Sequence, residues 1–268
     1  MSAIRPAVVA GSFYPGDPSV LAAEVAAYLA EAAPGPAQSH APKAIIAPHA
    51  GYMYSGAIAA SIYARLAPLR GIVRRVVLAG PAHRVYVKGA AIPAAEAFAS
   101  PLGAVPLDLP ALSRLRELDF VEVSDAAHAL EHSLEVHLPF LQSVLEEFAL
   151  VPIVVGDASP REMATLFGQL WGGDETLIVV SSDLSHYLPY DSARDRDRDT
   201  ARAIVHLEAR LVGEEACGAA PINGLLRAAR ERGLRAEMVD LRNSGDTAGG
   251  LDRVVGYGAF AFTEARHA

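Results

Sequence analysis

The chain has 268 residues, which suits one large domain or two small ones and allows a core that buries most of its apolar surface. Hydrophobic residues make up 51% and charged residues 20%, an ordinary globular balance that argues against disorder. The formal net charge of −8 disfavours a nucleic-acid backbone or an anionic membrane as the main partner.

Short apolar runs rich in β-branched residues recur along the chain and end at turn formers, as expected of strands buried on both faces. These predicted strands span 44–47, 75–79, 150–155 and 177–180. Two further predicted strands, 235–242 and 253–262, are joined by a glycine-rich turn at 243–250.

Segments with helical spacing of apolar residues lie between the strands. We expect helices over 18–32, from Ser55 to about Leu66, over 133–148, and from Ser159 onward. Ser159 has a strong start signal, because Pro160 follows it and Glu162 stands three residues after it. The alternating charges of 194–199 predict an exposed helix face.

The alternation of strands and helices favours an α/β fold with a central, mostly parallel sheet flanked by helices. The sequence has no internal repeat and no linker that would divide it. We therefore expect a single domain over residues 1–268.

The compartment is predicted from cysteine usage and from missing targeting signals. Cys217 is the one cysteine of the sequence, so neither an intrachain disulfide nor a cysteine zinc cluster can form. Residues 1–15 lack a basic leader with a sustained apolar stretch, and no run reaches the roughly 18 apolar residues of a membrane span. These features predict a reduced, cytoplasmic protein without a membrane partner.

Three histidines, His49, His83 and His186, each follow a predicted strand within a few residues. If these strands are parallel, all three imidazoles emerge at the carboxyl edge of one sheet, where open α/β folds bind ligands. One such histidine is more often structural than functional. Three at equivalent strand ends predict a site at this edge.

The segment 131–140 adds two more histidines, five residues apart. On a helix, His132 and His137 would diverge by about 140°, so they cannot easily share one ion. His132 stands at the expected helix start, where free N–H groups point toward a ligand, and is the better candidate. We expect His137 to be structural.

Carboxylates accompany these histidines at three positions: Glu131, Asp183 and Asp246. Asp183 shares the strand-end loop of His186 and either orients an imidazole or caps the next helix. Asp246 reaches the same edge if the last strands lie beside the sheet. Two histidines and one carboxylate are the usual protein ligands of non-haem ferrous iron. With an ordinary pKa of about 6.5, His186 suits an acid/base role.

Other chemistries have weaker support. No Gly-x-Gly-x-x-Gly follows a strand and no Walker A sequence is present, so nucleotide binding lacks its motifs. Gly-x-Ser-x-Gly is also absent, and serines 181 and 182 need a base within hydrogen-bond reach that sequence alone does not show.

Several segments resemble those of Memo-family proteins and occur in the same order. They are 48–56 (PHAGYMYSG), 80–83 (GPAH), 131–140 (EHSLEVHLPF) and 181–186 (SSDLSH), with 5–15 near the start and 254–257 near the end. The resemblance runs nearly end to end, and several of the segments are long enough to be specific.

The resemblance implies a fold similar to the class III extradiol ring-cleaving dioxygenases, which are non-haem iron enzymes. It also implies that His49 and His83 bind a metal and that His186 is an acid/base. His132 resembles a further pocket histidine, and Tyr54 is expected to help shape the pocket.

The third metal ligand departs from the family pattern. Dioxygenases supply a glutamate there, and the resemblance implies a cysteine of the C-terminal turn in animal Memo proteins. In this chain Thr247 stands opposite that position. Asp246, next to it, is the expected replacement, and Ser244 is a weaker alternative. Cys217 lies in a different segment, and we do not expect it to take this role.

Two hypotheses follow from these residues. The first is an iron-dependent, dioxygenase-like oxidoreductase with an unknown small-molecule or peptide substrate, in which zinc or copper could replace iron. The second is a non-catalytic metal-binding or adaptor protein. The resemblance also implies association with a radical-SAM partner protein. This chain lacks the three-cysteine cluster motif, so it is not itself the radical enzyme.

Overall fold

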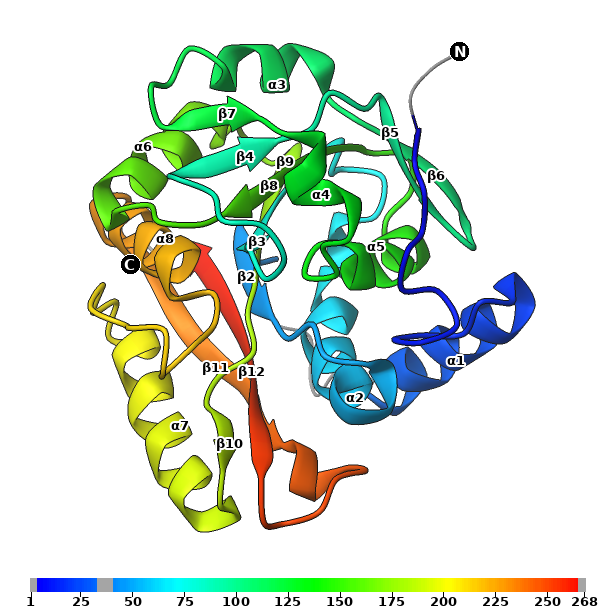
Figure 1. Ribbon diagram of the computed structural model, residues 1–268, viewed down its shortest axis with the longest axis vertical. Coiled ribbons are helices and arrows are strands. Elements are labelled where there is room, and N and C mark those ends of the chain that lie inside the picture. Colours follow the sequence, from blue (N-terminus) through cyan, green and yellow to red (C-terminus); the bar gives the residue numbers. More distant parts are fainter. Residues whose placement is uncertain (1–3, 33–40, 265–268) are drawn as a thin grey trace.

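The computed structural model describes residues 4–32 and 41–264 (Figure 1). The strands are β1 (Ile4–Arg5), β2 (Ala44–Ala47), β3 (Arg75–Pro81), β4 (Ala90–Ile92), β5 (Ala97–Ser100), β6 (Gly103–Pro106), β7 (Val121–Val123), β8 (Ala149–Val155), β9 (Thr176–Ser181), β10 (His186–Leu188), β11 (Leu234–Asn243) and β12 (Val254–Glu264). The α-helices are α1 (Pro18–Glu31), α2 (Tyr52–Tyr63), α3 (Leu109–Leu115), α4 (Asp125–Ala129), α5 (Leu138–Val144), α6 (Pro160–Leu170), α7 (Tyr190–Val205) and α8 (Ala219–Glu231). Short 3₁₀ helices are η1 (Ala64–Leu69), η2 (Glu135–His137) and η3 (Ser244–Asp246).

One large sheet organises the fold. Its strand order is β10-β12-β2-β9-β3-β8-β4-β7, and β11 pairs with β12. The four central strands β2, β9, β3 and β8 are parallel, whereas β12 joins β2 and β4 joins β8 in antiparallel fashion. The α/β class is therefore confirmed. The sheet is mixed, with parallel order at its centre.

Helices cover the sheet, and this explains the continuous apolar runs of its central strands. In Figure 1, α6, α7 and α8 lie to one side of the strand layer, and α1, α2 and α5 lie to the other. Every residue of β2 and of β9 is buried. A strand covered on both faces excludes polar side chains from both, so its sequence does not alternate.

The predicted capping box at Ser159 is present. The Ser159 hydroxyl accepts from the Glu162 N–H, the Glu162 carboxylate accepts from the Ser159 N–H, and α6 follows. The helix expected over 133–148 is wrong, because η2 and the short α5 share that segment and β8 begins at Ala149. One continuous helix would place Pro139 in its interior, where proline breaks the hydrogen-bond ladder.

The charged run 194–199 lies on α7, as an exposed face in all but one position. Asp197 is the exception and is buried. It falls four residues after Ala193 and three before Thr200, which places it on the buried stripe of the helix.

Candidate metal centre

The parallel centre of the sheet brings three strand ends together. In register, Ala47 of β2 lies beside Ser181 of β9, and β9 also pairs with β3. His49 and His83 follow β2 and β3, and His186 begins β10 just beyond β9. Their common edge follows from the strand order, which the sequence alone does not give.

Three imidazoles meet at this edge. One ligand atom from each of His49, His83 and His132 lies within 4.8 Å of the others. The ring centroids are 5.1 Å apart for His49 and His83, 5.4 Å for His49 and His132, and 4.7 Å for His83 and His132. This spacing suits three ligands around one ion.

The tautomer of His49 is fixed by a chain of two hydrogen bonds. The Ser181 hydroxyl donates to the Ser133 carbonyl oxygen at 2.6 Å, so its oxygen must accept from His49 Nδ1 at 2.6 Å. The lone pair of His49 therefore sits on Nε2. The ring is 2% exposed, and burial, followed by the neighbouring His83 and His132, lowers the pKa of His49 well below its usual value. A neutral imidazole with a free lone pair is the form that binds metals.

Glu131 orients His83 in a similar way. Its two carboxylate oxygens accept from the His83 backbone N–H at 2.6 Å and from His83 Nδ1 at 2.9 Å, which leaves Nε2 as the free nitrogen. It also accepts from the Ser133 N–H at 2.9 Å. Burial alone would raise the pKa of Glu131, but these hydrogen bonds outweigh it and lower the pKa to about 2. A carboxylate behind a histidine is a common support of metal ligands.

His132 lies in the loop before η2, so it is not at an α-helix start as we expected. Its ring stacks on His83, and its Nδ1 makes no hydrogen bond but lies 3.4 Å from Glu131 Oε1. Burial lowers the pKa of His132 to about 4, against the opposing effect of Glu131. His137 faces another part of the core, where its Nδ1 bonds the Tyr63 hydroxyl at 2.8 Å.

His186 adds a fourth imidazole near the group. Its Nδ1 donates to the Leu184 carbonyl oxygen at 2.8 Å, so Nε2 carries the lone pair. Burial, and secondarily His83, lowers the pKa of His186. The next residue, Tyr187, has a positive φ of 59°, which is rare for an aromatic residue and marks an irregularity of β10 beside the site.

Asp183 supports the backbone of His49. Its Oδ1 accepts from the His49 N–H at 2.8 Å, and its Oδ2 lies 3.9 Å from His49 Nε2. Burial raises the pKa of Asp183 to about 7, although the His49 and Ala50 N–H groups oppose this. The alternative expectation, that Asp183 caps the next helix, is wrong because Pro189 precedes α7. Tyr54 lies in the first turn of α2 and is partly buried.

Cys217, to which sequence analysis assigned no third-ligand role, lies beside His49. Its Sγ is 3.4 Å from His49 Nε2 and 3.6 Å from the Asp183 carbonyl oxygen. Gly218 permits this approach, since a Cβ there would lie 2.6 Å from the Ser181 carbonyl oxygen. Burial and then Asp183 raise the pKa of the Cys217 thiol to about 12. No local spacing links residue 217 to residue 49, so sequence reasoning missed the contact.

The structure does not bring Asp246 into the histidine group. Asp246 is exposed, and its carboxylate accepts from the Tyr190 hydroxyl at 2.5 Å and from the Asn243 N–H at 2.9 Å. Thr247 and Ser244, the other two residues considered for the third ligand, also form local hydrogen bonds. Thr247 donates to the Ser244 carbonyl oxygen, and the Ser244 hydroxyl accepts from the Val255 N–H of β12. The hydrogen bonds of this turn thus account for its local shape.

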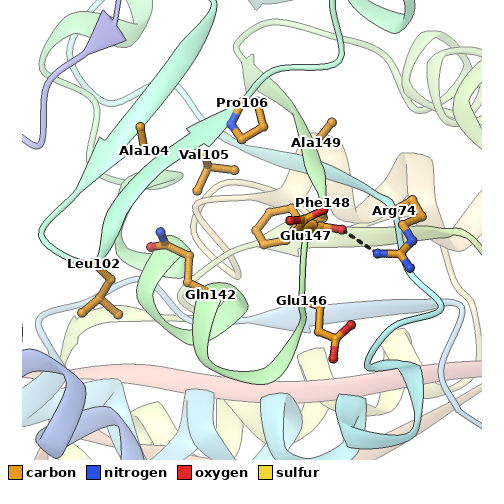
Figure 2. Close-up of a pocket in the computed structure, with 10 residues that line it drawn as sticks. All are labelled: Arg74, Leu102, Ala104, Val105, Pro106, Gln142, Glu146, Glu147, Phe148 and Ala149. Carbon is orange, nitrogen blue, oxygen red and sulfur yellow. Dashed lines mark hydrogen bonds between the residues drawn. The ribbon is translucent and has the colours of Figure 1, made fainter.

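A separate groove of about 760 Å³ lies at the opposite edge of the sheet (Figure 2). It is lined by residues at the amino ends of β3 and β8, including Arg74 and Ala149, and by Gln142 of α5. Because it opens at the amino edge, it does not belong to the histidine group.

The fold and the four imidazoles define an α/β protein with a candidate metal centre at the carboxyl edge of its sheet. A family model for "Memo-like protein" matches residues 5–261, and the chain belongs to the Memo family. In residues 4–32 and 41–264, no helix is long and apolar enough to cross a membrane.

Related proteins and one solved structure agree with this assignment. The chain is 36% identical to a MEMO1 family protein of Aquifex aeolicus, over 95% of this chain and 97% of that protein. It is 34% identical to a MEMO1 family protein of Ignicoccus hospitalis, over 97% and 98%. The crystal structure of uncharacterized protein JW3007 from Escherichia coli K12 aligns with a TM-score of 0.51 at 15% identity, covering 80% of this chain and 98% of that one. That likeness shows the fold alone.

We expect Glu131→Gln to weaken metal binding by about 10- to 100-fold, the usual effect of losing a group that orients a ligand. An amide has one accepting oxygen, so it cannot replace both oxygens that receive His83. Competition with a chromophoric chelator measures the affinity. The exposed Glu122→Gln is the matched control, and equal affinities in the two variants would contradict the role of Glu131.

We also expect the free energy of unfolding to fall by on the order of 3 kcal/mol between pH 7 and pH 4.5. The histidines with lowered pKa values are His49, His128, His132, His137 and His186. Below about pH 6.5 the unfolded chain protonates these groups while the folded chain does not, so acid favours unfolding. Asp183 and Asp197, with pKa values raised to about 7 and about 6, act in the opposite direction but are fewer.

Urea unfolding at several pH values tests this dependence. His128→Gln should reduce the slope, because it removes a buried histidine whose pKa is lowered to about 4. His206→Gln should not, since His206 is exposed. A free energy of unfolding that rises as the pH falls from 7 to 4.5 would contradict the lowered pKa values of these histidines.

Proposed function

We propose that this protein binds one divalent metal, iron(II), through His49, His83 and His132, and that it is a non-haem, dioxygenase-like oxidoreductase. The observation that carries the proposal is the mutual approach of the three ligand atoms within 4.8 Å. The unprotonated Nε2 atoms of His49 and His83 support it. The partly buried His132 supplies the third ligand atom of the same group.

Cys217 is a further candidate ligand. Two ligands of a tetrahedral ion with bond lengths of about 2.1 and 2.3 Å stand about 3.6 Å apart. The 3.4 Å between Cys217 Sγ and His49 Nε2 matches that separation. Imidazole ligands suit iron, zinc and copper, and thiolate also suits zinc and copper(I), so these two metals are the alternatives to iron.

The chain's own residues supply the remaining chemistry. A bound iron ion would contribute redox chemistry at positions that the protein leaves open. His186 Nε2 is unprotonated at neutral pH because burial lowers its pKa, so it can accept a proton from a substrate hydroxyl. Asp183 holds the backbone of His49, and Tyr54 stands at the start of α2 beside the same edge.

The test is the metal content of protein purified anaerobically without added metal. We expect about one equivalent of iron per chain, followed by oxygen uptake when catechols are offered as probes. Zinc or copper at one equivalent would replace iron in the proposal. Bound metal without oxygen uptake would favour a metal-binding or adaptor protein over an enzyme. A protein that is purified without metal and does not bind added iron would overturn the proposed metal centre.

A further inference from the structure

Asp197 is a buried carboxylate that the candidate metal centre does not use directly. It is 2% exposed, on the face of α7 that packs against β10 and β12. Its Oδ1 accepts from the Ser185 backbone N–H at 3.0 Å. Among the ion pairs of residues 4–32 and 41–264, none includes Asp197.

The carboxylate lies directly against β12. A Cβ on Gly256 would stand 1.9 Å from Asp197 Oδ2, so only glycine leaves room for the acid there. Gly256 in turn pairs with the segment before His186. Its N–H donates to the Ser185 carbonyl oxygen at 2.8 Å, and its carbonyl oxygen accepts from the Leu184 N–H at 2.8 Å. Leu184 and Ser185 are thus held by β12 on one side and by Asp197 on the other.

This held segment sets the state of the His186 ring. The Leu184 carbonyl oxygen accepts from His186 Nδ1 at 2.8 Å, which fixes the tautomer with a free Nε2. A change in the Leu184–Ser185 backbone would move that carbonyl and release the ring. The orientation of His186 therefore depends on a side chain of α7, the helix that follows β10.

Stability alone gives a poor reason for this carboxylate. Burying an acid without a cation disfavours its charged form, and burial raises the pKa of Asp197 to about 6, although the hydrogen bond from the Ser185 N–H opposes this. The five other residues of the run 194–199 are exposed, so the buried acid is a specific exception.

We propose that Asp197 is a positioning residue for His186. Its carboxylate fixes the Ser185 N–H, and this keeps the Leu184 carbonyl oxygen on His186 Nδ1 and Nε2 free to take a proton. The functional meaning of this arrangement rests on the proposed role of His186, but the arrangement itself is measurable in metal-free protein.

The experiment reads the His186 tautomer by long-range ¹H–¹⁵N NMR in ¹⁵N-labelled, metal-free protein, with the signal assigned by its loss in His186→Gln. We expect the Nδ1–H form in the wild type and a mixture of both tautomers in Asp197→Ala. Asp197→Asn should restore the wild-type spectrum, because its amide oxygen can accept from Ser185. The control is Asp199→Ala, an exposed change on the same helix.

A folded Asp197→Ala protein that keeps the pure Nδ1–H form would overturn the proposal, as would an Asp197→Asn protein that loses it. If the Asp197→Ala variant does not fold, a pH titration of the wild-type protein tests the contact instead. Over a pH titration of the wild type, the chemical shift of the Ser185 amide proton should follow that of the Asp197 carboxyl carbon. A Ser185 amide shift that does not follow it would refute the contact. None of these readings depends on metal, so they stand apart from the metal-content test.

Discussion

Replacing His49 with alanine should remove the bound metal, from about one equivalent to a trace, with a loss of affinity greater than about 100-fold. The loss of a group that merely orients a ligand already costs 10- to 100-fold, and a ligand contributes more. His49 is central to the group, because its ligand atom lies within 4.8 Å of those of the other two histidines and its Nε2 is 3.4 Å from the Cys217 sulfur. Inductively coupled plasma mass spectrometry on anaerobically purified protein gives the metal content.

The matched control is Asp246→Ala. The Asp246 carboxylate is used by Tyr190 and Asn243, so we expect this variant to retain its metal. Cys217→Ser then separates two donor sets: retained metal leaves a three-histidine centre, and lost metal adds the thiolate. Metal lost in Asp246→Ala but kept in His49→Ala would refute the site as we describe it.

Replacing Glu135 with glutamine should destabilise the fold by about 3–5 kcal/mol, the usual cost of breaking a buried ion pair by removing one partner. Glu135 is fully buried and pairs with the buried Arg5. It also accepts from the N–H groups of Val8 and Val9 and from the Tyr14 hydroxyl. An amide cannot accept from all four donors, and the guanidinium would lose its counter-charge.

Urea or thermal unfolding measures this effect. The control, Asp195→Asn, breaks an exposed pair with Arg198 on α7 and should cost less than about 1 kcal/mol. Because Arg5 also donates to the carbonyl oxygens of His128 and Glu131, Glu135→Gln should loosen the loop that carries His132 and weaken metal binding as well. Equal stability of the two variants would show that the Arg5–Glu135 contact is not formed in solution.

Parts of the site were accessible from the sequence because they follow local rules. His49 and His83 could be placed because each comes a few residues after a run of buried β-branched residues, and such runs end at one edge of a parallel sheet. The third member of the histidine group could not be placed in the same way. The expectation for Asp246 assumed that the tail turn reaches the histidines, and this depends on how η3 folds.

The sequence by itself determined the α/β class, the central strands, the capped start of α6 and the strand-end positions of His49, His83 and His186. These features depend on the burial and turn preferences of neighbouring residues. Only the tertiary structure decided that Cys217 touches His49, that His132 joins His83, and that Asp197 is buried beneath Ser185. Such contacts join segments up to 168 positions apart, as for Cys217 and His49. These contacts depend on the strand order and on the close approach that Gly218 and Gly256 allow. Neither feature can be deduced from hydrophobic periodicity along the chain.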